Sequence, residues 1–229
     1  MKKYLPIIKD AAVLLLVSTM FVTLCNMFFK SLKKTVDADP VVTAMLQNNL
    51  SAARELLGDK GFAASKTPYP SLEAYQHARL ELPDDFGRTP LMWTAYVNIS
   101  GEERLKKADA ERAPFAEFFI KSGAGLDTQD KDGWTALMWA SWSGLTSVAG
   151  KLAEAGASLA PADRQGNTAL MLAAMRGNSD IVRLLMDKRA DRSAADKRGK
   201  KAVDLAREGL AAYSDKKQSY DKILALLDK

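Results

Sequence analysis

The chain has 229 residues, and its 33 basic and 28 acidic side chains give a formal net charge of +5. That excess belongs to residues 1–34, where six lysines oppose a single acidic residue, Asp10. The rest of the chain is balanced in charge, so it gives no support to binding of nucleic acid or of an acidic substrate. The single cysteine, Cys25, excludes an intramolecular disulfide and is compatible with either redox compartment.

A mostly apolar run from Ala11 to Phe29 follows a short tail of residues 1–10 and precedes a linker of residues 30–40. These 19 residues are long enough to cross a bilayer as a helix, so we predict a transmembrane anchor. A cleavable signal peptide is the main alternative, although the run is long for a signal core and no Ala-x-Ala site closes it. A lipoprotein box ending at Cys25 is a further alternative, but Leu24 stands where a small residue is expected.

Charge does not decide the orientation of this anchor. Three lysines lie on each side of the apolar run, so the positive-inside count is level. A Met-Lys-Lys start before one apolar span is similar to a bacterial signal anchor, which predicts the inner membrane with the rest of the chain in the periplasm. The cluster of Lys30, Lys33 and Lys34 opposes that translocation, so a cytoplasmic position stays open.

Two less regular segments follow the linker. Residues 41–61 show the apolar spacing of a short helix pair. Residues 62–83 include Pro68, Pro70 and Pro83 and are predicted to be an insertion, either functional or loose.

A regular repeat begins later in the chain. The pattern Asp-x-x-Gly-x-Thr-x-Leu-x-x-Ala starts at Asp130 and returns at Asp163 with every spacing kept, a period of 33 residues. The aspartate and glycine suit a tight turn, and the threonine is placed to cap the helix that follows. We therefore predict helix-turn-helix units at 130–162 and 163–195, and a divergent unit at 196–229.

A similar opening at Asp84 carries Thr89-Pro90-Leu91. Its glycine, Gly87, stands 46 positions before Gly133, which is 13 more than the period of 33. We therefore predict a unit at 84–129 that contains a charged insertion at about residues 98–113.

These motifs resemble the ankyrin repeat. The resemblance implies an all-α solenoid of helix-turn-helix repeats with short β-turn fingers, here preceded by one transmembrane helix. It assigns residues 41–229 to the repeat domain, with 41–61 and 196–229 as capping repeats. Stacked repeats of this kind build extended surfaces that hold partners rather than pockets for chemistry.

The resemblance also implies where a partner binds. In the family, the positions of Trp93, Trp139 and Leu172 on the first helix face a concave groove. The positions three residues further along the chain, which are Tyr96, Trp142 and Met175, face the same groove. Trp134 takes the position that points along the projecting finger. The predicted partner-binding residues are Trp93, Tyr96, Trp134, Trp139, Trp142, Leu172 and Met175. Large aromatic side chains supply much of the energy of protein interfaces. The alternative is that these rings pack on one another and on neighbouring repeats.

Catalysis has little support in the sequence. The single histidine, His77, lies in the first insertion without a nucleophile that the sequence attaches to it. No cysteine or histidine cluster suits a metal, and no glycine-rich loop suits a phosphate, so we expect no catalytic residue, cofactor, metal or small-molecule substrate.

The sequence thus predicts a non-catalytic, membrane-anchored adaptor that binds a protein partner in an aromatic groove. Two alternatives are an accessory subunit of a membrane complex, held through the Ala11–Phe29 helix, and a regulator or stabiliser of a periplasmic enzyme.

Overall fold

The computed structural model describes residues 39–65, 69–99 and 101–228. The predicted tail and the predicted anchor, Ala11–Phe29, lie outside these ranges. Within them, no helix is long and apolar enough to cross a membrane. The regular elements of the described residues are helices, as the repeat pattern predicts.

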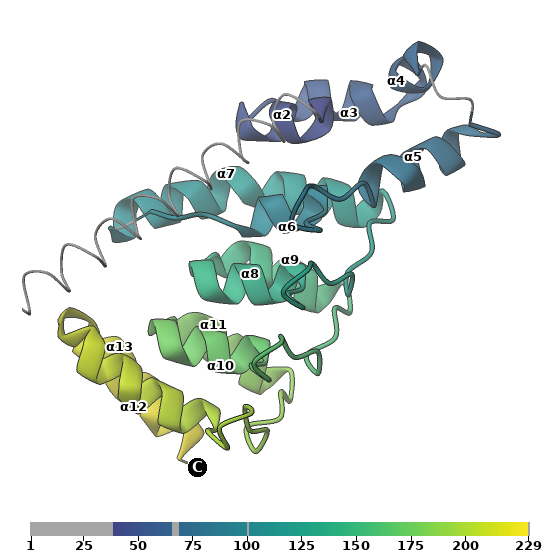
Figure 1. The fold of residues 1–229 in the computed structure, drawn as a ribbon. Helices are drawn as coiled ribbons and strands as arrows, with labels where there is room; N and C mark the ends of the chain where they lie inside the picture. Colours follow the sequence, from purple (N-terminus) through teal and green to yellow (C-terminus); the bar gives the residue numbers. More distant parts are fainter. Residues whose placement is uncertain (1–38, 66–68, 100, 229) are drawn as a thin grey trace, which may run out of the picture.

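The helices stack in successive pairs along the chain, and the loops that join one pair to the next project to the same side (Figure 1). The N-terminal part contains α2 (Pro40–Leu46), α3 (Leu50–Leu57), α4 (Asp59–Ala64) and α5 (Leu72–Leu80). The pairs that follow are α6 (Pro90–Ala95) with α7 (Glu102–Lys121), α8 (Ala136–Ser143) with α9 (Thr146–Glu154), and α10 (Ala169–Arg176) with α11 (Ser179–Asp187). The last pair is α12 (Ala202–Ala212) with α13 (Lys217–Leu227), joined by the short 3-10 helix η1 (Ser214–Lys216).

The first helix of each regular pair begins directly after the predicted threonine. The side-chain oxygens of Thr89, Thr135 and Thr168 each accept a hydrogen bond from the backbone N–H three residues later. Such a bond satisfies one of the N–H groups that a helix start leaves unpaired. The divergent last unit has Lys201 at this position, and the backbone N–H of Lys201 instead donates to the Asp204 carboxylate at 3.0 Å.

The hydrophobic core runs through the stack. The leucine of the repeat pattern is buried in each first helix, at Leu91, Leu137, Leu170 and Leu205. The adjacent methionines, which follow three of these leucines, are buried in the same core cluster. Each repeat thus covers its apolar face with the next one, as a solenoid requires.

The loops between pairs form the predicted fingers, and neighbouring fingers are joined by backbone hydrogen bonds. Lys131 N–H donates to the Phe86 carbonyl at 2.9 Å, and Arg164 N–H donates to the Asp132 carbonyl at 3.0 Å. The same bond recurs between Lys197 and Gln165 at 2.9 Å. One register therefore holds across the four fingers.

Both predicted insertions contain ordered helix. The segment at about 98–113 is mostly the first half of α7, which makes the second helix of this repeat 20 residues long. Its Asp109 carboxylate accepts hydrogen bonds from the backbone N–H groups of Ser147 at 2.8 Å and Val148 at 3.2 Å, at the start of α9. In the 62–83 segment, α5 packs on the first repeat, where the Tyr75 hydroxyl donates to the Leu56 carbonyl at 2.6 Å.

Candidate partner-binding groove

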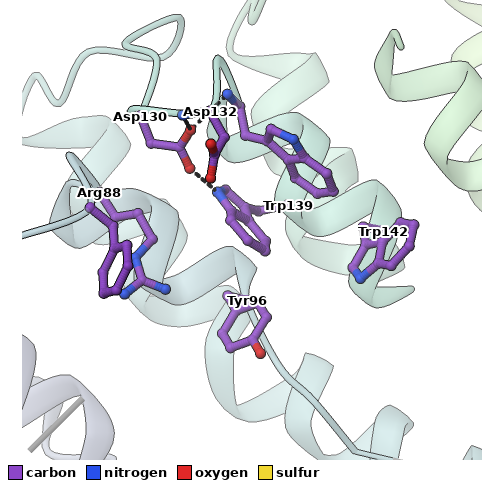
Figure 2. A pocket seen from close by; sticks show the side chains of 8 residues that line it. Arg88, Tyr96, Asp130, Asp132, Trp139 and Trp142 are labelled. Atoms are coloured by element: carbon purple, nitrogen blue, oxygen red, sulfur yellow. Dashed lines mark hydrogen bonds between the residues drawn. The ribbon is translucent and has the colours of Figure 1, made fainter. Parts of the chain in front are cut away.

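Two neighbouring repeats enclose a half-open hollow of about 340 Å³ between their fingers and first helices (Figure 2). We call it the aromatic hollow. Its lining residues are Phe86, Arg88, Tyr96, Asp130, Asp132, Trp134, Trp139 and Trp142.

Four of the lining rings form one connected cluster. The ring centroids of Trp134 and Trp139 are 4.5 Å apart, with an interplanar angle of 43°. Tyr96 meets Trp139 edge to face at 5.0 Å, and Trp134 meets Trp142 edge to face at 5.6 Å. Edge-to-face and tilted pairs at these separations are favourable because the positive edge of one ring meets the negative face of another. The four side chains are half-buried, so part of each ring remains open to solvent.

Asp130 positions both the finger and the nearest indole. One carboxylate oxygen, Oδ1, accepts the backbone N–H groups of Asp132 and Trp134, each at 2.9 Å. The other, Oδ2, accepts the indole Nε1–H of Trp139 at 2.9 Å. Figure 2 shows Trp139 between this carboxylate and Tyr96. The turn residue of the repeat therefore also orients the central ring of the hollow.

An arginine lies at each end of the aromatic cluster. The guanidinium of Arg88 is 4.2 Å from the ring centroid of Trp93 and 4.7 Å from that of Phe86. Arg88 is also ion-paired with Asp84 at 2.8 Å. At the other end, the guanidinium of Arg176 is 4.6 Å from the ring centroid of Trp142 and also stacks on Tyr213.

Comparison with protein families identifies the family of this chain. A family model described as ankyrin repeats in three copies matches residues 41–163, 104–196 and 153–213. These matches together cover residues 41–213, which is more than half of the chain. The protein belongs to the ankyrin-repeat family. A comparison with curated proteins found no match. Ankyrin repeats form a protein–protein interaction module, and this chain carries such a module.

The ankyrin stack brings together only some of the predicted binding residues. Tyr96, Trp134, Trp139 and Trp142 meet in the aromatic hollow. Met175 is half-buried on α10 and does not line it.

Two of the predicted positions require correction. Trp93 is 2% exposed and Leu172 is 1% exposed, so neither side chain presents a surface to a partner. Trp93 lies under the Arg88 guanidinium, and its ring meets that of Tyr96 at an angle of 82°. Leu172 is part of the core cluster. For these two residues, internal packing is the correct alternative.

Sequence reasoning missed the contributions of the preceding finger. The repeat register identifies Arg88 as the equivalent of Trp134, but it does not show that Phe86 and Arg88 form one wall of the hollow. The stacking of repeats could have predicted this wall, because adjacent fingers place equivalent positions side by side. Among the described residues, no group of three or more His, Cys, Asp or Glu side chains is placed to hold a metal ion.

Proposed function

We propose that this protein is a non-catalytic, membrane-anchored adaptor that holds a protein partner at the aromatic hollow. The observation that carries the proposal is the gathering of four half-buried aromatic side chains at one junction between repeats. At the next junction, the positions of Trp134, Trp139 and Trp142 are taken by Asn167, Leu172 and Met175. A stack of repeats therefore does not need aromatic residues at these positions.

Aromatic side chains are enriched at protein interfaces relative to the rest of the protein surface. Tryptophan and tyrosine are also enriched among the residues that dominate binding energy. The hollow is built on helices and on fingers held by backbone hydrogen bonds, so its side chains are positioned before a partner arrives. A preorganised surface loses less entropy on binding.

We further propose that residues 11–29 anchor the protein in a bacterial inner membrane, with the ankyrin repeats in the periplasm. The length and apolar character of this run support the anchor. Fusion of the C-terminus to alkaline phosphatase or to green fluorescent protein tests the orientation. A periplasmic domain makes the phosphatase active and leaves the fluorescent protein dark, and the reverse result places the repeats in the cytoplasm.

The partner is sought by purifying the full chain from its native membranes in mild detergent and identifying the proteins that co-purify. The test variant carries Trp134→Ala and Trp142→Ala. The control carries Phe118→Ala, which removes a half-buried aromatic ring from the second-helix layer, on α7. We expect a partner that is retained by the control and lost from the test variant, with circular dichroism showing that both variants are folded.

Retention of the same partners by both variants would overturn the role of the hollow. If those partners then disappear when residues 11–29 are exchanged for an unrelated membrane span, the protein is an accessory subunit held through its anchor.

A further inference from the structure

We propose that the aromatic hollow receives a basic side chain, lysine or arginine, from an exposed segment of the protein partner. This inference rests on the proposed function and names the chemistry that the partner presents.

The rings of the hollow suit a cation. The ring plane of Trp139 is inclined by 43° to that of Trp134 and by 83° to that of Tyr96, so the surface offers ring faces in more than one direction. A cation near a ring face is attracted by the negative charge of the π-system, most strongly for tryptophan. The Trp139 indole also donates its Nε1–H to the Asp130 carboxylate. That bond shifts electron density toward the ring and strengthens its attraction for a cation.

The charges around the hollow favour a cation as well. Asp130 and Asp132 contribute two carboxylates to its lining. The positive charge of Arg88 is compensated by Asp84, whose carboxylate also accepts the Nε–H of Arg88 at 2.9 Å. The residues that line the hollow therefore carry a net negative charge, which Arg164 beside Asp132 and Arg176 over Trp142 reduce. An entirely apolar partner side chain would gain nothing from these carboxylates.

Asp132 remains available for such a partner. Its closest described cation is Arg164 of the next finger, at 3.9 Å, and both side chains are about two-thirds exposed. Exposed ion pairs of this kind contribute little and rearrange readily.

The protein already uses the same chemistry at both ends of the cluster. Arg88 lies over Trp93, and Arg176 lies over Trp142. Among the described residues, no cation lies over the rings of Trp134 or Trp139 in the middle. The middle is also where the carboxylates are. A basic side chain from the partner would complete the series of stacked cations and rings.

The test uses the full-length protein in detergent and three blocked pentapeptides, in which a central lysine, arginine or norleucine is flanked by alanines. Norleucine has the straight carbon chain of lysine without its charge. Binding is followed by tryptophan fluorescence and by the NMR signal of the Trp139 indole N–H. We expect the lysine or the arginine peptide to bind about tenfold more tightly than the norleucine peptide, which is the size of a partly desolvated cation–π contact.

Three variants separate charge from shape. Asp132→Asn is expected to weaken binding of the basic peptides several-fold and to leave the norleucine peptide unchanged. Arg164→Ala removes the competing cation and is expected to strengthen binding of the basic peptides. Asp180→Asn is the control, because Asp180 lies on α11 and pairs with Arg183 there. It is expected to change nothing.

Equal binding of all three peptides would overturn the inference. Failure of all three peptides to bind would overturn it as well. The proposed function is tested separately, by co-purification of the partner. If the co-purified partner still depends on Trp134 and Trp142 while the peptides show no preference for charge, the hollow binds a partner but does not select a cation. If the basic peptides bind but the partner ignores the loss of both tryptophans, the hollow is a cation site outside the adaptor interface.

Discussion

The Asp130 carboxylate is the group on which the geometry of the aromatic hollow most depends. Asp130 as a residue is 8% exposed, and its carboxylate accepts hydrogen bonds from two backbone N–H groups of its finger and from the indole of Trp139. Asp163 makes the equivalent backbone bonds in the next repeat, but its second oxygen accepts the side-chain amide of Asn167 at 3.0 Å. The two repeats thus share the backbone hydrogen bonds of the turn, and they differ in the side chain that donates to the second carboxylate oxygen.

This arrangement predicts the effect of removing one N–H group. Trp139→Phe keeps an aromatic ring but leaves Oδ2 of a buried aspartate without its donor. We expect the free energy of unfolding, measured by urea denaturation, to fall by about 1–3 kcal/mol, because a buried acceptor loses its partner. Trp142→Phe is the matched control and should cost less, because no described hydrogen bond uses its indole N–H. Equal losses would show that the bond to Asp130 contributes no stability.

Tyr220 provides a prediction in alkaline solution. Its side chain is 0% exposed, and its hydroxyl donates to the Met175 carbonyl at 2.8 Å. Burial disfavours the phenolate and raises the pKa of Tyr220 to about 12, from 10.0 in the unfolded chain. Between these two values the folded state keeps a proton that the unfolded state has lost, so stability must fall as pH rises.

The measurement is the free energy of unfolding from urea titrations between pH 9 and pH 12. We expect Tyr220→Phe to lower stability by about 1 kcal/mol at neutral pH, through loss of one hydrogen bond, and to flatten the decline above pH 10. Tyr213→Phe removes an exposed hydroxyl whose charge raises the pKa of Tyr220 less than burial does, so it should flatten the decline less than Tyr220→Phe. A decline of the same steepness in Tyr220→Phe would mean that another group causes it.

At the scale of the helix, the lengthened α7 has a structural consequence for its neighbour. The N-cap residue of α9 is Leu145, which makes no side-chain capping bond. Asp109 of α7 takes over that role from the adjacent repeat by accepting the N–H groups of Ser147 and Val148. A carboxylate at this end of a helix also interacts favourably with the helix dipole.

We therefore expect Asp109→Ala to destabilise the protein by about 1–2 kcal/mol, the usual cost of losing a helix cap. Glu111→Ala on the same helix is the control, because Glu111 is exposed and forms a loose ion pair with Lys107 at 3.9 Å. Urea denaturation measures both. A cost for Asp109→Ala no greater than that of the control would show that α9 does not depend on this cap.

The same helix shows where sequence reasoning stops. The threonine caps, the turn glycines and the 33-residue period predict α8 to α11 because each is a local signal. The charged stretch that forms the first half of α7 has no such signal, since its role is to extend this helix toward the start of α9. The predicted binding residues show the same difference between what the sequence predicts and what only the fold reveals. The register places Trp93 and Trp139 at equivalent positions, but only the three-dimensional contact with Arg88 shows that Trp93 is covered.

For the whole molecule, the stacking of fingers is the contact that repeats from one unit to the next. Each of the three later fingers donates one backbone N–H to a carbonyl of the preceding finger, at 2.9 to 3.0 Å. Stability in such stacks is approximately a sum of the stability of each repeat and of the interfaces between neighbours. A change at a finger contact should therefore weaken one interface without altering the fold of the repeats on either side.

Gly166 and Gly199 allow this expectation to be tested, because both have a left-handed backbone, with φ of +87° and +77°. A Cβ at Gly166 would lie 3.0 Å from the backbone nitrogen of Lys197, whereas a Cβ at Gly199, on the last finger, would meet nothing within 4 Å. Alanine costs about 1–2 kcal/mol in this conformation at either position. We expect Gly199→Ala to cost that amount and Gly166→Ala to cost measurably more in urea denaturation, because it also forces two fingers apart. Equal costs would mean that the fingers adjust without loss, and that the helices alone hold neighbouring repeats together.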